Sequence, residues 1–191
     1  MRVGLLGGSF NPAHAGHAHI AEVARRRLGL DRVIWLVSPQ NPLKDARHSA
    51  PLRQRMASAR TVAAGPSMIV SDVETRMGTR YTIDTLRMLK GRFPGVKFVW
   101  LMGADNLATV HRWRGWTDIF DLVPIAVIAR PGRLAAARTA PAARRFAAAR
   151  LPSSQALCLA EREVPAWVYL RARLNHASST AIRAAANPPQ S

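Results

Sequence analysis

Short apolar runs alternate along the chain with segments in which apolar residues recur every three or four positions. Five of the runs predict buried β-strands, and a sixth, at residues 164–170, predicts a short last strand. The five runs lie at residues 3–6, 32–37, 68–73, 96–102 and 125–129. Because these runs are mainly apolar rather than alternating, we expect strands that are covered on both faces of a sheet.

Helical periodicity separates the predicted strands. In the segment 17–28, Ile20, Val23, Ala24 and Leu28 share one face, and Gly29 ends the helix. Further helices are predicted at residues 53–64, at residues 81–89 and, at the end of the chain, at residues 178–187. Alternating strands and helices are typical of the α/β class, with a doubly wound parallel sheet. In such sheets ligands bind at the carboxyl ends of the strands.

The length of 191 residues fits one domain spanning 1–191. Residues 131–150 are rich in alanine and arginine and contain no acidic residue, which fits either a surface helix or a mobile, poorly packed segment. We interpret them as an irregular segment within that domain rather than as a second domain. No apolar run is long enough to span a membrane, and the first residues do not read as a secretory signal. Cys158 is the only cysteine, which excludes an internal disulfide and a thiolate metal cluster. We therefore expect a cytoplasmic protein.

The net charge of +17 favours anionic partners. Arginine supplies 25 of the 28 basic residues, and the chain is also rich in alanine, a pairing that codon usage in a GC-rich genome would produce. A basic RNA-binding protein is the alternative outside the enzymes. The arginine clusters lack the interleaved aromatic residues of single-strand readers, so we expect no nucleic-acid partner.

The most informative motif is the stretch 7–17, which directly follows the first predicted strand. A glycine-rich turn there opens a helix and exposes backbone N–H groups beside the positive end of the helix dipole, an arrangement suited to phosphate. His14 and His17 stand where they can donate hydrogen bonds to phosphate oxygens. Two histidines without a third ligand make zinc an unconvincing alternative.

Two later motifs carry similar chemistry. Residues 178–183 read Ser-Ser-Thr-Ala-Ile-Arg, which is either a plain helix N-cap or a second anion site whose Arg183 suits phosphate. Gly103 and Asp105 follow the fourth strand, where α/β enzymes keep polar functional groups. Trp113 is either a core residue or a platform for a flat heteroaromatic ring.

Together the motifs resemble the nucleotidylyltransferase superfamily, which has an (H/T)-x-G-H element after the first strand and an S-x-T-x-x-R element late in the chain. Residues 14–17 here read His-Ala-Gly-His. The longer stretch 7–17 is similar to bacterial nicotinate-nucleotide adenylyltransferases in particular. Further agreement lies at residues 38–44, 80–86 and 103–105, at Trp113 and at residues 130–132. The resemblance covers about residues 3–186 and implies a Rossmann-like fold of the nucleotidylyltransferase type.

The implied reaction joins ATP to nicotinate mononucleotide, giving nicotinate adenine dinucleotide and pyrophosphate in NAD biosynthesis. Mg²⁺ would be carried by the ATP phosphates, with no metal site made by the protein alone. The resemblance assigns catalysis to His14, His17 and Arg183. It assigns ATP binding to these three and to Gly7, Gly8, Ser9, Phe10, Gly103, Asp105, Ser178 and Thr180. It assigns the mononucleotide pocket to Lys44, Tyr81, Thr82, Asp105 and Trp113.

The acceptor is less well determined than ATP. A sister adenylyltransferase that uses nicotinamide mononucleotide or pantetheine phosphate is the alternative within the enzymes. Arg114 stands beside Trp113 where an aromatic residue is expected, and Ala177 replaces a β-branched residue before the late motif. The chain also ends soon after its last helix begins, which leaves the surface of a homo-oligomer open.

Overall fold

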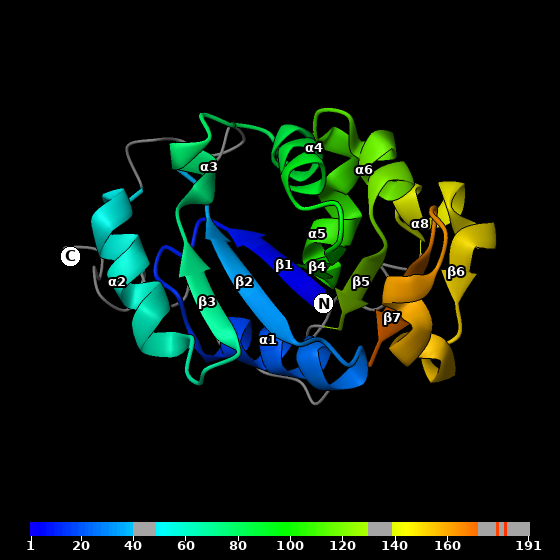
Figure 1. The fold of residues 1–191 in the computed structure, drawn as a ribbon, viewed down its shortest axis with the longest axis horizontal. Coiled ribbons are helices and arrows are strands. Elements are labelled where there is room, and N and C mark those ends of the chain that lie inside the picture. The colour runs from blue at the N-terminus through cyan, green and yellow to red at the C-terminus, as the bar shows by residue number, and fades with distance from the viewer. Residues whose placement is uncertain (40–48, 130–138, 172–178, 180–181, 183–191) are drawn as a thin grey trace, which may run out of the picture.

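Seven parallel strands form one sheet in the computed structural model, which describes residues 1–39, 49–129 and 139–171 together with Ser179 and Ile182. The strand order is β3-β2-β1-β4-β5-β7-β6 (Figure 1). The strands are β1 (Arg2–Gly8), β2 (Arg32–Val37), β3 (Met68–Ser71), β4 (Lys97–Gly103), β5 (Ile125–Ile128), β6 (Arg150–Leu151) and β7 (Trp167–Leu170). The predicted doubly wound α/β fold is therefore confirmed.

The central strand β1 lies between β2 and β4. Leu5 of β1 is in register with Ile34 of β2 on one side and with Trp100 of β4 on the other. From β1 the chain builds outward to β2 and β3 and then crosses back to β4, so the strand order reverses between β1 and β4. A crevice opens at such a switch point, outside the carboxyl ends of the strands. The end of β1 therefore leads into the position that is best suited to a ligand.

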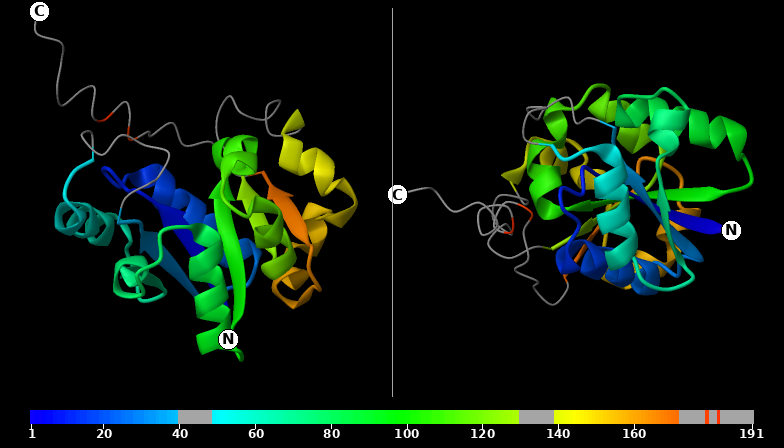
Figure 2. Two further views of the ribbon diagram at one scale, coloured as in Figure 1. Left: turned by 90° about the horizontal axis from the view of Figure 1, so that it is seen from above. Right: turned by 90° about the vertical axis from the view of Figure 1, so that its left-hand side faces the viewer.

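Helices cover both faces of the sheet (Figure 2). Ile20 of α1 and Met56 of α2 pack on one face, whereas Leu86 of α4 and Phe120 of α6 pack on the other. The α-helices are α1 (Ala15–Arg27), α2 (Leu52–Val62), α3 (Val73–Arg76), α4 (Thr82–Arg92), α5 (Ala104–Thr109), α6 (Trp116–Leu122) and α8 (Pro141–Arg145). The 3₁₀ helices are η2 (Val110–Arg112), η3 (Ala147–Ala149) and η4 (Ser153–Glu161). Within the described residues, no helix combines the length and the apolar content needed to cross a bilayer.

All six predicted strands and the first three predicted helices exist close to their expected bounds. The third strand is shorter than predicted, because Asp72 is the N-cap of α3 and Val73 already belongs to that helix. The periodicity missed α5 and α6, since each spans fewer than two full turns. Gly115, the N-cap of α6, lies in the left-handed region (φ 60°), where a Cβ would lie 3.3 Å from Ile83. The final predicted helix, apart from Ser179 and Ile182, lies outside the described residues.

The interpretation of residues 131–150 as irregular needs correction over 139–150. This part forms α8, η3 and the start of β6, and it belongs to the core. Phe146 is stacked on Phe120 at 4.2 Å between ring centroids, and its carbonyl accepts a 2.7 Å hydrogen bond from the Trp167 indole. The alanines made the segment read as weakly apolar, but Ala142 and Ala143 are buried because small side chains let α8 approach α5 and η2 closely. The single-domain organisation stays a prediction.

Candidate active site

The opening turn, residues 9–14, connects β1 to α1 at the carboxyl edge of the sheet. Phe10 sits there in the left-handed region (φ 47°), which a bulky side chain rarely adopts. Its ring is buried, stacked on Trp35 at 5.2 Å and edge-on to His17 at 5.0 Å. Such strained backbone costs about 1–3 kcal/mol and persists where surrounding packing fixes it, most often at functional sites.

The two histidines of the first motif close the N-terminus of α1 with reciprocal hydrogen bonds. His14 is the N-cap, and its Nδ1 accepts a 3.1 Å bond from the backbone N–H of Gly16. His17 Nδ1 in turn accepts a 3.2 Å bond from the backbone N–H of His14. This is a capping box built from histidines, and it brings the two ring centroids to 3.9 Å.

These hydrogen bonds also fix the chemical form of both rings. A ring nitrogen that accepts a hydrogen bond carries no proton, so in the neutral imidazole the proton resides on the other nitrogen. His14 and His17 therefore both carry Nε2–H donors at the start of α1. Donors held in place before a ligand arrives are what stabilisation of developing negative charge requires.

Helix α2 anchors the opening turn from one side. The backbone N–H of Ala13 donates to Ser58 Oγ at 3.1 Å. Asn11 Oδ1 accepts from the backbone N–H of Ala50, just before α2, at 3.2 Å. Asn11 and Ala13 of the turn are thus tied to α2 and to the residues just before it.

Arg55 of α2 is the residue that sequence reasoning missed on this side. It is 3% exposed, and its guanidinium donates to four main-chain carbonyls at 2.7–2.9 Å. These carbonyls belong to Ser9, Ser38, Pro39 and Ala50. Burial lowers the pKa of the guanidinium from its ordinary value. The sequence could have indicated this burial, because Arg55 lies one turn before the buried Ala59 on the apolar face of α2.

Position 7 requires glycine, because an aromatic ring on the neighbouring strand β4 leaves no room for a side chain. A Cβ on Gly7 would lie 2.4 Å from the ring of Trp100 on β4, far inside contact distance. Trp100 is buried and also meets Trp113 edge-on at 6.3 Å between centroids. Trp100, which no sequence pattern singled out, therefore bridges the end of β1 and the predicted ring platform.

One hydrogen bond joins the late motif to the opening turn. Ser179 Oγ donates to the carbonyl of Pro12 at 3.0 Å, across 167 positions of sequence. The first and late motifs therefore meet at this residue. Ser178, Thr180, Arg183 and Lys44 lie outside the described residues.

The remaining predicted residues lie at the neighbouring strand end and at the start of α4. Gly103 ends β4 and is the N-cap of α5, which places the half-buried Asp105 in the first turn of that helix. Tyr81 is the N-cap of α4 and Thr82 its first residue. The Arg114 guanidinium lies 4.7 Å over the Tyr81 ring, a cation–π contact that gives this unexpected arginine a partner.

Glu74 is a buried acid behind the start of α4. Its Oε1 accepts a 3.3 Å hydrogen bond from Thr85, whose hydroxyl also lies 2.8 Å from that of Thr79 and 3.3 Å from the carbonyl of Tyr81. Burial raises the pKa of Glu74 to about 7, and the Thr85 hydrogen bond opposes this shift. The carboxyl group therefore titrates near neutral pH next to the predicted mononucleotide pocket. No sequence pattern distinguished it from a surface acid.

A parallel sheet with a turn suited to phosphate at its switch point is typical of α/β proteins that bind nucleotides. Similarity to known proteins identifies the class. The family model described as cytidylyltransferase-like matches residues 5–185. A probable nicotinate-nucleotide adenylyltransferase of Caulobacter sp. (strain K31) is 67% identical over 96% of this chain and 97% of its own length. Another from Methylorubrum extorquens is 54% identical over 96% of this chain and 99% of its own length.

The chain belongs to the cytidylyltransferase-like family and, within it, to the nicotinate-nucleotide adenylyltransferases. A solved structure of the Plasmodium falciparum nicotinic acid mononucleotide adenylyltransferase complexed with NaAD has the same fold. It matches with a TM-score of 0.73 and 14% identity, over 100% of this chain and 86% of that one. The family predicted from the first and late motifs is therefore confirmed.

Proposed function

We propose that this chain transfers the adenylyl group of ATP to nicotinate mononucleotide, forming nicotinate adenine dinucleotide and pyrophosphate in NAD biosynthesis. The observation that carries the proposal is the 67% identity over nearly the whole chain with a relative that bears this activity in its name. The histidine capping box at the end of β1 supports it, because it presents two oriented donors at the position where this fold binds phosphate.

In the proposed reaction a phosphate oxygen of the mononucleotide attacks the α-phosphorus of ATP. The new P–O bond forms as the bond from the α-phosphorus to the bridging oxygen breaks, and pyrophosphate leaves with that electron pair. Little covalent chemistry falls to the protein in phosphoryl-type transfer, so its task is positioning and charge stabilisation. His14 and His17 donate from Nε2 to phosphate oxygens on which charge develops.

The other ATP contacts are those that the resemblance to the family implies. Gly7, Gly8, Ser9 and Phe10 line the nucleotide from the end of β1. Ser9 Oγ supports this assignment, because it is buried and lacks a hydrogen-bond partner in the described structure. Gly103 and Asp105 approach from the end of β4, and Ser178, Thr180 and Arg183 hold the distal phosphates.

The mononucleotide binds on the opposite side, between the start of α4 and Trp113. The pyridine ring stacks on Trp113, whose half-buried indole is supported edge-on by Trp100. Tyr81, Thr82 and Asp105 line the pocket, and Lys44 contacts the phosphate. A cytoplasmic location and homo-oligomer formation stay predictions.

Mg²⁺ is proposed to enter with the ATP phosphates. Among the described residues no three His, Cys, Asp or Glu side chains are grouped to hold an ion, and Mg²⁺ is commonly held by one or two carboxylates together with substrate phosphates. Asp105 is the carboxylate at the strand end that fits this limited role. Bound Mg²⁺ would supply neutralisation of the phosphate charge, while His14 and His17 orient the phosphate groups.

The test is pyrophosphate release from ATP with three acceptors in parallel: nicotinate mononucleotide, nicotinamide mononucleotide and pantetheine phosphate. The proposal expects nicotinate mononucleotide to give the highest kcat/KM. Faster turnover with either of the other acceptors would assign the chain to a sister adenylyltransferase. Tight, salt-dependent RNA binding without pyrophosphate release would favour the non-enzyme alternative.

A further inference from the structure

A basic cavity lies at the outer edge of the sheet, beside β6 and β7. Its volume is about 570 Å³, which is within the range of small-molecule sites. Its lining residues are Arg27, Arg150, Leu151, Pro152, Ser153, Tyr169 and Arg171. The lining thus combines three arginines and two hydroxyl groups with no carboxylate. β7 is the third strand beyond β1, so the cavity is separate from the opening turn.

The three arginines come from different elements. Arg27 ends α1, Arg150 begins β6, and Arg171 follows β7. In the described part of the chain none of them forms an ion pair, whereas the neighbouring Arg25 and Arg26 both pair with Glu22. Three guanidinium groups around one cavity repel one another, and an anion bound between them would relieve that repulsion.

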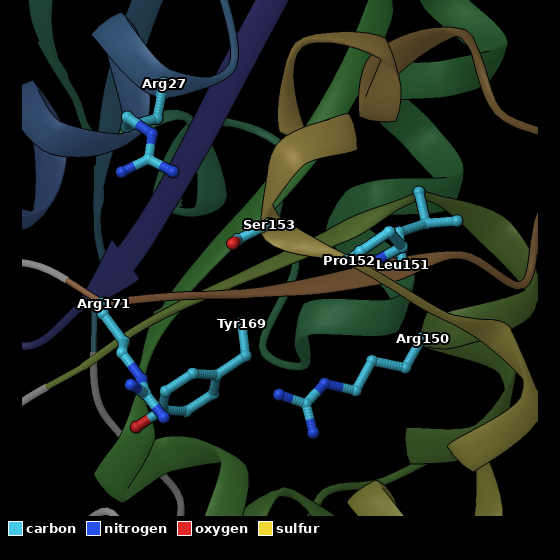
Figure 3. A pocket seen from close by; sticks show the side chains of 7 residues that line it. All are labelled: Arg27, Arg150, Leu151, Pro152, Ser153, Tyr169 and Arg171. Atoms are coloured by element: carbon cyan, nitrogen blue, oxygen red, sulfur yellow. The ribbon is translucent and has the colours of Figure 1, made fainter.

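Tyr169 supplies an independent sign of a ligand site. The residue is 8% exposed, and its hydroxyl is buried without a hydrogen-bond partner in the described structure. Arg150 and Arg171 flank its ring in Figure 3, and the Arg150 guanidinium is 5.7 Å from the ring centroid. Buried hydroxyl groups normally have a partner, so each exception calls for an explanation.

The chemistry of these groups selects one ligand class. Guanidinium groups match phosphate oxygens with paired N–H donors, more closely than they match a spherical ion. Burial raises the pKa of Tyr169, an effect that Arg150 and Arg171 oppose, so the phenol keeps its proton at neutral pH and can donate it. The spread of the three arginines over one cavity favours an extended anion over a single phosphate.

We propose that this edge cavity is a second anion site, which binds a di- or triphosphate chain through Arg150, Arg171 and the Tyr169 hydroxyl, with Arg27 at its rim. This phosphate chain is either inorganic or part of a nucleotide. None of these residues is assigned to the adenylyl-transfer site, so the proposal does not depend on the proposed function; only the second equivalent expected in the titration below rests on it.

The test is calorimetric titration of the full chain with inorganic triphosphate at low salt. Wild type is expected to bind two equivalents, one at each site, and the double variant R150Q/R171Q only one. The matched control is R144Q/R145Q, which removes the same charge from exposed positions of α8 that do not line the cavity and should still bind two. Because Arg150 also stacks on Trp167, Arg171→Gln alone is included, with at least about tenfold weaker binding expected at this site.

A single equivalent in wild type, unchanged in R150Q/R171Q, would overturn the proposal. Equal losses in R150Q/R171Q and R144Q/R145Q would also overturn it, since they would reflect net charge alone. A parallel titration with ADP separates the two sources of the phosphate chain, because a nucleotide site would bind ADP more tightly than inorganic triphosphate. Pyrophosphate release measured on the same preparations keeps a failure of the adenylyl-transfer proposal distinct from a failure here.

Discussion

The opening turn and the acceptor side, formed by Tyr81, Thr82 and Trp113, lie near the same end of the sheet but are held differently. Hydrogen bonds fix the turn: the histidine capping box, Ser58, and the buried Arg55 together hold its backbone. Ring contacts hold the acceptor side, where Trp113 meets Trp100 and Tyr81 lies under Arg114. The difference suits their proposed tasks, because phosphate needs donors in fixed positions, whereas a planar ring needs a matching surface.

Of the substitutions proposed here, Arg55→Lys has the largest expected effect, and it tests how the opening turn is held. Arg55→Lys keeps the charge but cannot direct four N–H groups to four carbonyls, so buried carbonyls lose their partners. We expect a loss of about 3 kcal/mol in the free energy of unfolding, measured by denaturant titration. Arg60→Lys on the exposed face of α2 is the control, and a similar loss there would remove the special role of Arg55.

His17 tests the turn's donors directly. Replacement by alanine should lower kcat about 100-fold, or about 2.7 kcal/mol in the activation barrier, the range for a lost charge-stabilising donor. Asparagine can retain the capping acceptor without the Nε2–H, so His17→Asn should lower kcat with less loss of thermal stability than His17→Ala. His19→Ala on the same helix serves as the control. Near-normal turnover of His17→Asn would refute the donor role.

Glu74 tests the acceptor side through pH. Its folded pKa of about 7 lies above the ordinary value of 4.5, so the folded state binds the proton more tightly. The stabilisation is full below pH 4.5 and is lost as pH rises through 7, a change of about 2 kcal/mol between pH 5 and pH 8. Glu74→Gln should flatten this pH dependence in denaturant titrations, whereas Glu163→Gln at an exposed site should not. An unchanged slope in Glu74→Gln would contradict the buried-acid interpretation.

Trp113 gives the smallest expected effect and sharpens the division between the two regions. Trp113→Ala should raise KM for the mononucleotide about tenfold, which corresponds to about 1.4 kcal/mol, while KM for ATP stays nearly constant. Trp113→Phe keeps a ring and should recover most of the loss. Steady-state kinetics with each substrate varied in turn make the measurement. An equal rise in both KM values would show that the two regions are not independent.

Local pattern explains which parts of the fold the sequence predicted well. Buried parallel strands such as Val33 to Val37 are continuous apolar runs, and α1 shows its buried face in its spacing, so both were predicted close to their observed bounds. Helices α5 and α6 were missed because a segment of six or seven residues does not complete two turns of periodicity. Residues 139–150 were misread because their burial depends on the Phe120 ring, which is far away in sequence.

The candidate site likewise has parts that the sequence predicted and parts that only the tertiary structure showed. Residues 7–17 and 178–183 identified the family and its chemistry by themselves, because phosphate-binding turns need particular residue types at fixed local spacing. Only the tertiary structure gave the histidines their common tautomer, since this depends on which backbone N–H groups their Nδ1 atoms meet. It alone showed Arg55 holding the turn and Glu74 buried behind α4. Long-range contacts and desolvation set those properties, and a one-dimensional pattern contains neither.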